Sequence, residues 1–173
     1  MMSRLAIALV LAICVMLHPK SAQAADADRM VEVFHGAMAT LPDLKDLERF
    51  ATWQGFKVVS RQRAGGVLSF LETVDASGNV FLVGIRDHNE TLGTNVSRVL
   101  VMHYETTQDY FKTLLTSARR NLPKGPEQKV DLDGGFIAGQ AWAANYPDLV
   151  TFQTKYHQPE RASLMEALVV SAQ

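Results

Sequence analysis

Between Phe56 and Thr106 the sequence alternates short apolar runs with turn-forming residues. Three runs, 56–63, 67–74 and 80–86, are separated by an Ala-Gly-Gly triplet and by Asp-Ala-Ser-Gly-Asn, and a fourth run, 98–106, follows a polar loop. Gly and Asn tolerate the positive φ angles that tight hairpins need. The stretch therefore predicts a four-stranded antiparallel meander.

Alternation assigns the side chains of these strands to faces of the sheet. In the run 98–106 the even-numbered residues, including Leu100, Met102 and Tyr104, point to one face, and the odd-numbered ones point to the other. The run 80–86 is apolar on both faces. That pattern favours a central strand covered on both sides over a half-solvated one.

Helical spacing appears on either side of the meander. Residues 28–41, with Asp28 as cap, and the stripe from Leu44 to Ala51, ended by Gly55, predict a helical hairpin interrupted at Pro42. Residues 106–109, Thr-Thr-Gln-Asp, have the form of a capping box that opens a third helix, and Pro123 stops it.

The remainder of the chain returns to strand patterns, at 128–132, 136–144, 149–157 and 163–171. The last segment also begins well as a helix after Pro159, but its alternation favours a strand. The sequence therefore predicts an α+β fold: an antiparallel sheet of about seven or eight strands in two meanders, with an N-terminal helical hairpin and one central helix packed on it. Similar turns at 74–78 and 130–134 hint at duplication, although turn chemistry alone produces such a match.

The first 24 residues have the pattern of an export signal. Arg4 supplies the positive charge, 5–17 is an apolar stretch of thirteen residues, and Ala22-Gln-Ala24 fits a cleavage site. A retained anchor is the alternative, but a spanning helix needs roughly 20 apolar residues. We expect cleavage after Ala24 and a single periplasmic or secreted domain, 25–173, with no transmembrane segment after cleavage.

Loss of the leader changes the composition of the chain. The only cysteine, Cys14, leaves with it, so the remaining domain depends on its core alone for stability. Removing Arg4 and Lys20 from the 17 basic residues leaves 15 against 18 acidic ones, a net charge of −3. This balance gives no reason to expect nucleic-acid binding.

Three residues form a weak catalytic candidate. If the runs 80–86 and 98–106 pair, His103, Glu105 and Arg86 could meet at one end of the sheet for general acid–base chemistry. Cross-strand charge pairs at a solvated strand end are the alternative, and they are the favoured one. The histidine spacing predicts no metal site, and no motif predicts a cofactor.

Two surfaces indicate binding. The first is a cluster of cations around the end of the third helix, Lys112, Arg119, Arg120, Lys124 and Lys129, which either complements the helix dipole or docks an acidic partner.

The second surface is the run 137–144, in which Gly139, Ala141 and Ala143 line one face with little side-chain volume. The third helix is expected to fill that groove. The sharper hypothesis is a small apolar ligand, with Phe136, Trp142 and Phe152 near its rim.

Three functions follow from these features. The leading hypothesis is an exported, non-catalytic binding module, accessory or inhibitor-like, that contacts another envelope or secreted protein. The second is a carrier of a small apolar ligand in a groove between sheet and helix. The third is a small hydrolase or isomerase that uses His103 and Glu105.

Overall fold

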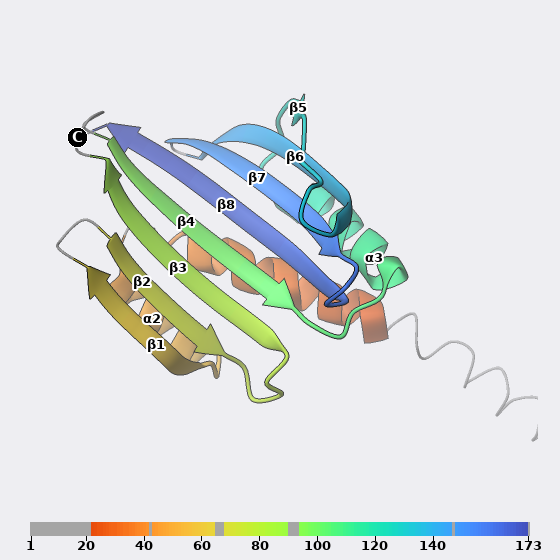
Figure 1. Ribbon diagram of the computed structural model, residues 1–173, viewed down its shortest axis with the longest axis horizontal. Coiled ribbons are helices and arrows are strands. Elements are labelled where there is room, and N and C mark those ends of the chain that lie inside the picture. Colours follow the sequence, from red (N-terminus) through yellow and green to blue (C-terminus); the bar gives the residue numbers. More distant parts are fainter. Residues whose placement is uncertain (1–21, 42, 65–67, 90–93, 147, 173) are drawn as a thin grey trace, which may run out of the picture.

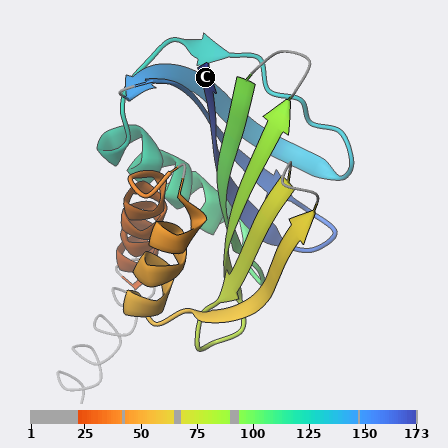
Figure 2. The ribbon, with the colours of Figure 1, turned by 90° about the vertical axis from the view of Figure 1, so that its left-hand side faces the viewer.

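A computed structural model describes residues 22–41, 43–64, 68–89, 94–146 and 148–172. Eight antiparallel strands form one layer, and the helices of the described residues cover one face of it (Figure 1). Figure 2 shows this arrangement edge-on, with the helices of the described residues all on one side of the sheet. The predicted α+β class and its helical cover are confirmed.

The chain runs through two similar halves. The first contains a helix over residues 22–38, α2 (Leu44–Trp53), β1 (Lys57–Ala64), β2 (Leu68–Val74), β3 (Val80–Asn89) and β4 (Thr94–His103). The second contains α3 (Gln108–Asn121), β5 (Glu127–Gln128), β6 (Phe136–Tyr146), β7 (Asp148–His157) and β8 (Ala162–Ala172). The C-terminal segment is a strand, as its alternation predicted.

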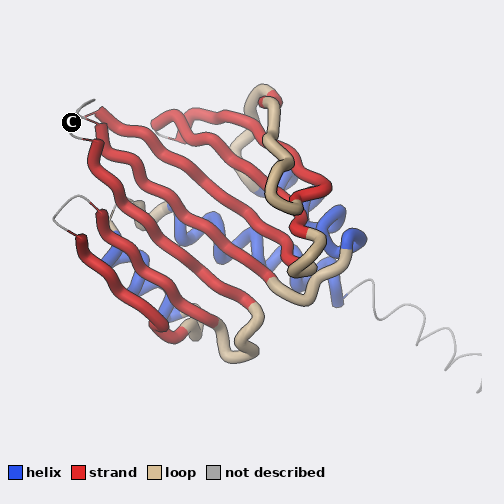
Figure 3. Tube along the Cα trace, in the orientation of Figure 1, coloured by secondary structure: helices blue, strands red, loops and turns tan. Residues whose placement is uncertain are grey.

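Each half contributes a meander, and the two meanders join in the middle of the sheet. The strand order is β1-β2-β3-β4-β8-β7-β6-β5, so β4 and β8 are the central pair (Figure 3). The turns at 74–78 and 130–134 are not equivalent, because the first joins β2 to β3 whereas the second precedes β6. The proposed correspondence between these two turns was therefore wrong.

The core lies between the sheet and the helices. Val99 and Val101 on β4 and Met165 on β8 are fully buried there. The helix α2 packs closely on β3 because Gly84 has no side chain: a Cβ at that position would overlap the side chains of Leu44 and Leu47. None of the described helices has the length and apolar character needed to cross a membrane.

The boundaries of two helices differ from those predicted. The residue that caps α3 is Thr107, whose Oγ1 accepts a hydrogen bond from the Tyr110 amide at 3.1 Å. Its neighbour Thr106 is buried and hydrogen-bonds to the Arg161 carbonyl at 3.1 Å and to Ser163 Oγ at 2.9 Å. It therefore fastens the end of β4 to the turn before β8.

The first helix is already formed at residue 22, so Asp28 lies inside it and is not its cap. The Asp28 carboxylate instead accepts hydrogen bonds from Ser117 and Arg120 on α3. These contacts hold the pKa of Asp28 below its usual value, because both partners stabilise the charged form. The strand expected at 128–132 is reduced to the two residues of β5.

Candidate functional site

The face of the sheet opposite the helices, here called the open face, is rich in apolar side chains. Antiparallel sheets with one uncovered face usually alternate apolar and polar residues, with the polar ones toward water. Here partly exposed apolar residues extend across the central strands: Phe70, Phe81, Ile85, Val96, Leu100, Met102, Tyr104, Leu164, Leu168 and Val170. Large apolar patches on protein surfaces are often interaction sites, so the open face is the candidate functional site.

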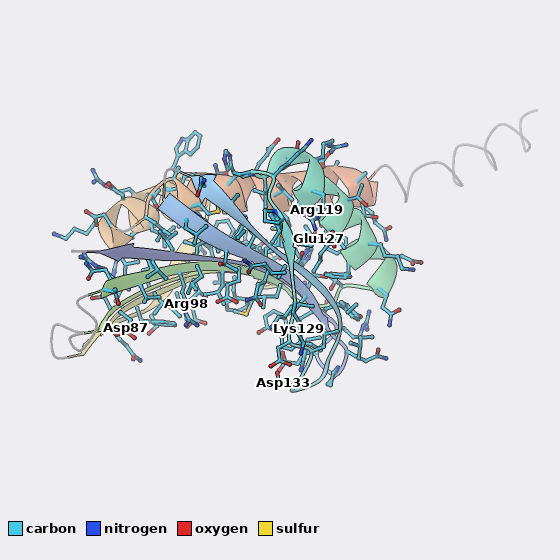
Figure 4. All side chains as sticks on the ribbon, turned by 90° about the horizontal axis from the view of Figure 1, so that it is seen from above. Asp87, Arg98, Arg119, Glu127, Lys129 and Asp133 are labelled. Atoms are coloured by element: carbon cyan, nitrogen blue, oxygen red, sulfur yellow. The ribbon has the colours of Figure 1, made fainter. Side chains whose placement is uncertain are left out.

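Charged residues are interspersed with this patch. Arg98 and Glu166 lie on neighbouring central strands, with Nη1 and Oε1 3.7 Å apart. Asp87, Lys155 and Glu72 lie on the flanking strands of the same face. Figure 4 shows Asp87 and Arg98 on the side of the sheet away from the helices. The open face is therefore an apolar surface with both signs of charge.

A small cavity of about 230 Å³ lies at one end of the open face. Met102, Leu164 and Phe136 supply much of its apolar lining. His157 is held at its edge, with Nε2 2.9 Å from the Gly134 carbonyl oxygen and Nδ1 3.4 Å from a Glu160 carboxylate oxygen. Of the predicted ligand-binding residues, Phe136 lies here.

The other predicted ligand residues lie elsewhere. Trp142 and Phe152 are buried on the helix side of the sheet, where their rings stack with centroids 5.3 Å apart. The indole N–H donates to the Pro123 carbonyl at 2.9 Å, and the Arg119 guanidinium lies 4.4 Å from the ring centroid. Protein side chains thus fill the space expected to form a ligand rim.

The small residues of β6 point to the opposite side from Trp142, so α3 does not cover them. Ala141 and Ala143 are nevertheless buried, because the segment before β6 folds against this strand. The Ala143 amide donates to the Pro126 carbonyl at 3.2 Å, and a Cβ on Gly139 would lie 3.1 Å from Leu132. The expectation that the third helix fills this groove was wrong.

The three catalytic candidates do not converge. The register of β3 and β4 places His103 opposite Val80 but Arg86 opposite Ser97, six residues away, which is about 20 Å along a strand. Glu105 lies beyond β4 with a φ of 59°, and its carboxylate accepts from Asn79 Nδ2 at 3.4 Å. Arg86 instead lines a cavity of about 330 Å³ beside α2.

His103 has different partners, which the sequence analysis missed. Its Nδ1 lies 3.0 Å from Tyr110 Oη and 3.7 Å from Asp26 Oδ2, and its side chain is 18% exposed. Burial lowers the pKa of His103, although Asp26 and Asp75 oppose this effect. Burial, together with Asp26, raises the pKa of Tyr110. The arrangement joins β4, α3 and the first helix through the His103 imidazole and the Tyr110 hydroxyl.

The cation cluster at the end of α3 is mostly paired. Arg119 binds Glu127 at 2.7 Å, Arg120 binds Asp28 at 2.6 Å, and Lys112 binds Asp109 at 2.9 Å. Figure 4 shows Arg119 beside Glu127 on the helix side of the sheet, and the Lys129 side chain on the side away from α3. Lys124 and Lys129 are exposed. The five residues therefore do not form one basic surface. Arg119 and Arg120 connect α3 to acidic residues outside it, whereas Lys112 pairs within the helix.

Within the described ranges, no group of three or more His, Cys, Asp or Glu side chains is arranged to hold a metal ion. Comparison with known proteins gives no match to a family model, to a curated protein or to a solved structure.

Proposed function

We propose that this protein is an exported, non-catalytic binding module that contacts another protein through the open face of its sheet. The observation that carries the proposal is the apolar character of that face across β2, β3, β4 and β8. Removing such side chains from water is favourable by about 25 cal/mol per Å² of apolar surface, and this gain offsets the entropy that two proteins lose when they associate. An accessory or inhibitor-like role is consistent with a surface that offers contact area and no converging reactive groups.

The open face and the space between sheet and helices favour a protein partner over a small ligand. Trp142 and Phe152 occupy the space between sheet and helices. The cavity on the open face, at about 230 Å³, is below the roughly 300–1,000 Å³ that is usual for small-molecule sites. A broad apolar surface that extends over several strands is better suited to a second protein surface.

Export is supported by the leader pattern of residues 1–24. The partner is accordingly an envelope or secreted protein. The experiment is affinity capture with the full chain expressed in an exporting host, using envelope and secreted fractions, at low and at raised salt. Leu100→Lys places a charge in the centre of the open face, and Trp53→Lys is the matched control because Trp53 is 80% exposed on α2.

We expect a partner captured by the wild type and by Trp53→Lys to be lost with Leu100→Lys. Retention at raised salt is expected, since apolar contact is not screened. Equal capture by Leu100→Lys and the wild type would contradict the proposal.

A further inference from the structure

The open face has an internal two-fold pattern that follows from the strand registers. Val99 pairs with Ala167 across the central strands, Gly84 pairs with Val99, and Phe152 pairs with Ala167. A rotation of 180° about an axis through the Val99–Ala167 pair, perpendicular to the sheet, exchanges β4 with β8 and β3 with β7. Each residue of β3 and β4 is then exchanged with the residue 68 positions later.

This rotation relates open-face charges of opposite sign. It exchanges Arg98 with Glu166, and Asp87 with Lys155. Asp87 lies on β3 opposite Val96, two residues before Arg98 on β4. Lys155 lies on β7 opposite Leu164, two residues before Glu166 on β8. The four residues therefore follow one diagonal of the face in the order Asp87, Arg98, Glu166, Lys155, with alternating sign.

If the same row of four charges is placed opposite itself in the reverse order, every charge faces one of opposite sign. If two copies stack face to face about a two-fold axis that lies parallel to the sheets and perpendicular to the diagonal, each Arg98 meets Glu166 of the second copy. Each Asp87 then meets Lys155. Such an isologous interface closes as a dimer. Glu72 lies away from the diagonal.

The residues beside the diagonal are apolar and match in the same way. Leu100 and Leu168 flank it on opposite sides, and the stacking sets each of them close to its own copy in the second molecule. Strands about 4.8 Å apart and about eight residues long give a sheet area of roughly 600 Å² from β2 to β7. Side-chain relief brings this area near the ~800 Å² per partner of a standard interface.

We infer that a partner of the open face is a second copy of this chain, held face to face by leucine contacts and by Arg98–Glu166 and Asp87–Lys155 pairs across the interface. The inference rests on the proposed function, since both use the open face for binding. It adds a definite occupant, a definite orientation and a reason for the alternating charges.

The test uses charge reversal, with sedimentation velocity of the full chain from an exporting host over the micromolar range. R98E alone and E166R alone each oppose like charges across the interface, and we expect each to weaken dimerisation by at least about tenfold. An equimolar mixture of the two variants restores opposite charges at every position, so a dimer re-forms. The double variant R98E/E166R is also dimeric. A wild-type monomer throughout, unchanged dimerisation of the single variants, or no recovery on mixing would overturn the inference.

A second measurement avoids altering the charges. Leu100→Cys in a Cys14→Ser background has one thiol, near the dimer axis, and we expect a short bismaleimide to link two copies in high yield. Trp53→Cys in the same background is the control and should link poorly. Equal yields would contradict the face-to-face arrangement. If the protein is monomeric but loses a captured partner with Leu100→Lys, the dimer is overturned and the proposed function stands. If the protein is a dimer but no other partner is captured, the dimer stands and binding to a different protein is overturned.

Discussion

Replacing Trp142 by alanine tests whether the space between sheet and helices is core or ligand site. Trp142 is 1% exposed and stacks on Phe152, with ring centroids 5.3 Å apart. Truncating a buried Trp to Ala costs about 3–5 kcal/mol. The indole hydrogen bond to Pro123 accounts for about 1 kcal/mol of the contacts that are lost. We therefore expect Trp142→Ala to lower the free energy of unfolding by about 4 kcal/mol, or to lower Tm by roughly 8–16 °C.

The assay is urea unfolding followed by far-ultraviolet circular dichroism, because the substitution itself alters tryptophan fluorescence. Trp53→Ala is the matched control: its side chain is 80% exposed, so the change should stay within about 0.5 kcal/mol. Trp142→Phe keeps a ring against Phe152 and should fall between the two. A loss below about 1 kcal/mol for Trp142→Ala would refute the packing described here.

Three further predictions can be checked by the same unfolding assay. Burial lowers the pKa of His103 below the value of about 6.5 expected in the unfolded chain, so the unfolded state binds a proton first as the pH falls. The free energy of unfolding should therefore decrease below about pH 6.5. His103→Gln should reduce this pH dependence, and an unchanged pH profile would contradict the prediction. Gly84→Ala should lower the free energy of unfolding by about 1–3 kcal/mol, because the new methyl group overlaps Leu47. The double variant with Leu47→Ala should lose less than the sum of the two single losses, whereas additive losses would contradict the contact. Thr107→Ala should cost about 1 kcal/mol and Thr107→Ser much less, and equal losses would argue against the cap.

Local pattern was sufficient to predict most of the sheet. The turn-forming residues in the sequence after Ala64 and Val74 and the alternation around Leu100 correctly indicated the strands of the first meander, because hairpins depend on residues close in sequence. Residues 65–67 themselves lie outside the described part of the chain. The alternation also separated Val99 and Val101 from Leu100 and Met102. It could not say which of the two faces the helices cover, since both faces of the central strands are apolar.

That uncertainty explains the error at β6. Alternation correctly grouped Gly139, Ala141 and Ala143, but the third helix lies on the other face, against Trp142. The segment ending near Leu132 covers the small residues instead. Its path over the sheet depends on contacts that no periodic pattern encodes.

In the candidate sites, too, local pairing could be predicted from the sequence but long-range contacts could not. Hairpin pairing of β3 with β4 was predicted, but its register decides that Arg86 lies far from His103. The partners of His103 are Tyr110, across a loop, and Asp26, on the first helix. The charge diagonal on the open face likewise requires the pairing of β4 with β8, which are distant in sequence.

Methionine oxidation measures directly whether the open face is covered when the protein works. Met102 lies partly exposed on that face, and Met165 is fully buried under the helices as an internal control. In dilute purified protein, mild peroxide should oxidise Met102 much faster than Met165. In the intact exporting cell or its secreted fraction, we expect oxidation of Met102 to slow by at least about fivefold, because a bound protein excludes the oxidant. Equal rates of Met102 oxidation in the two settings would contradict the claim that this face is a binding surface.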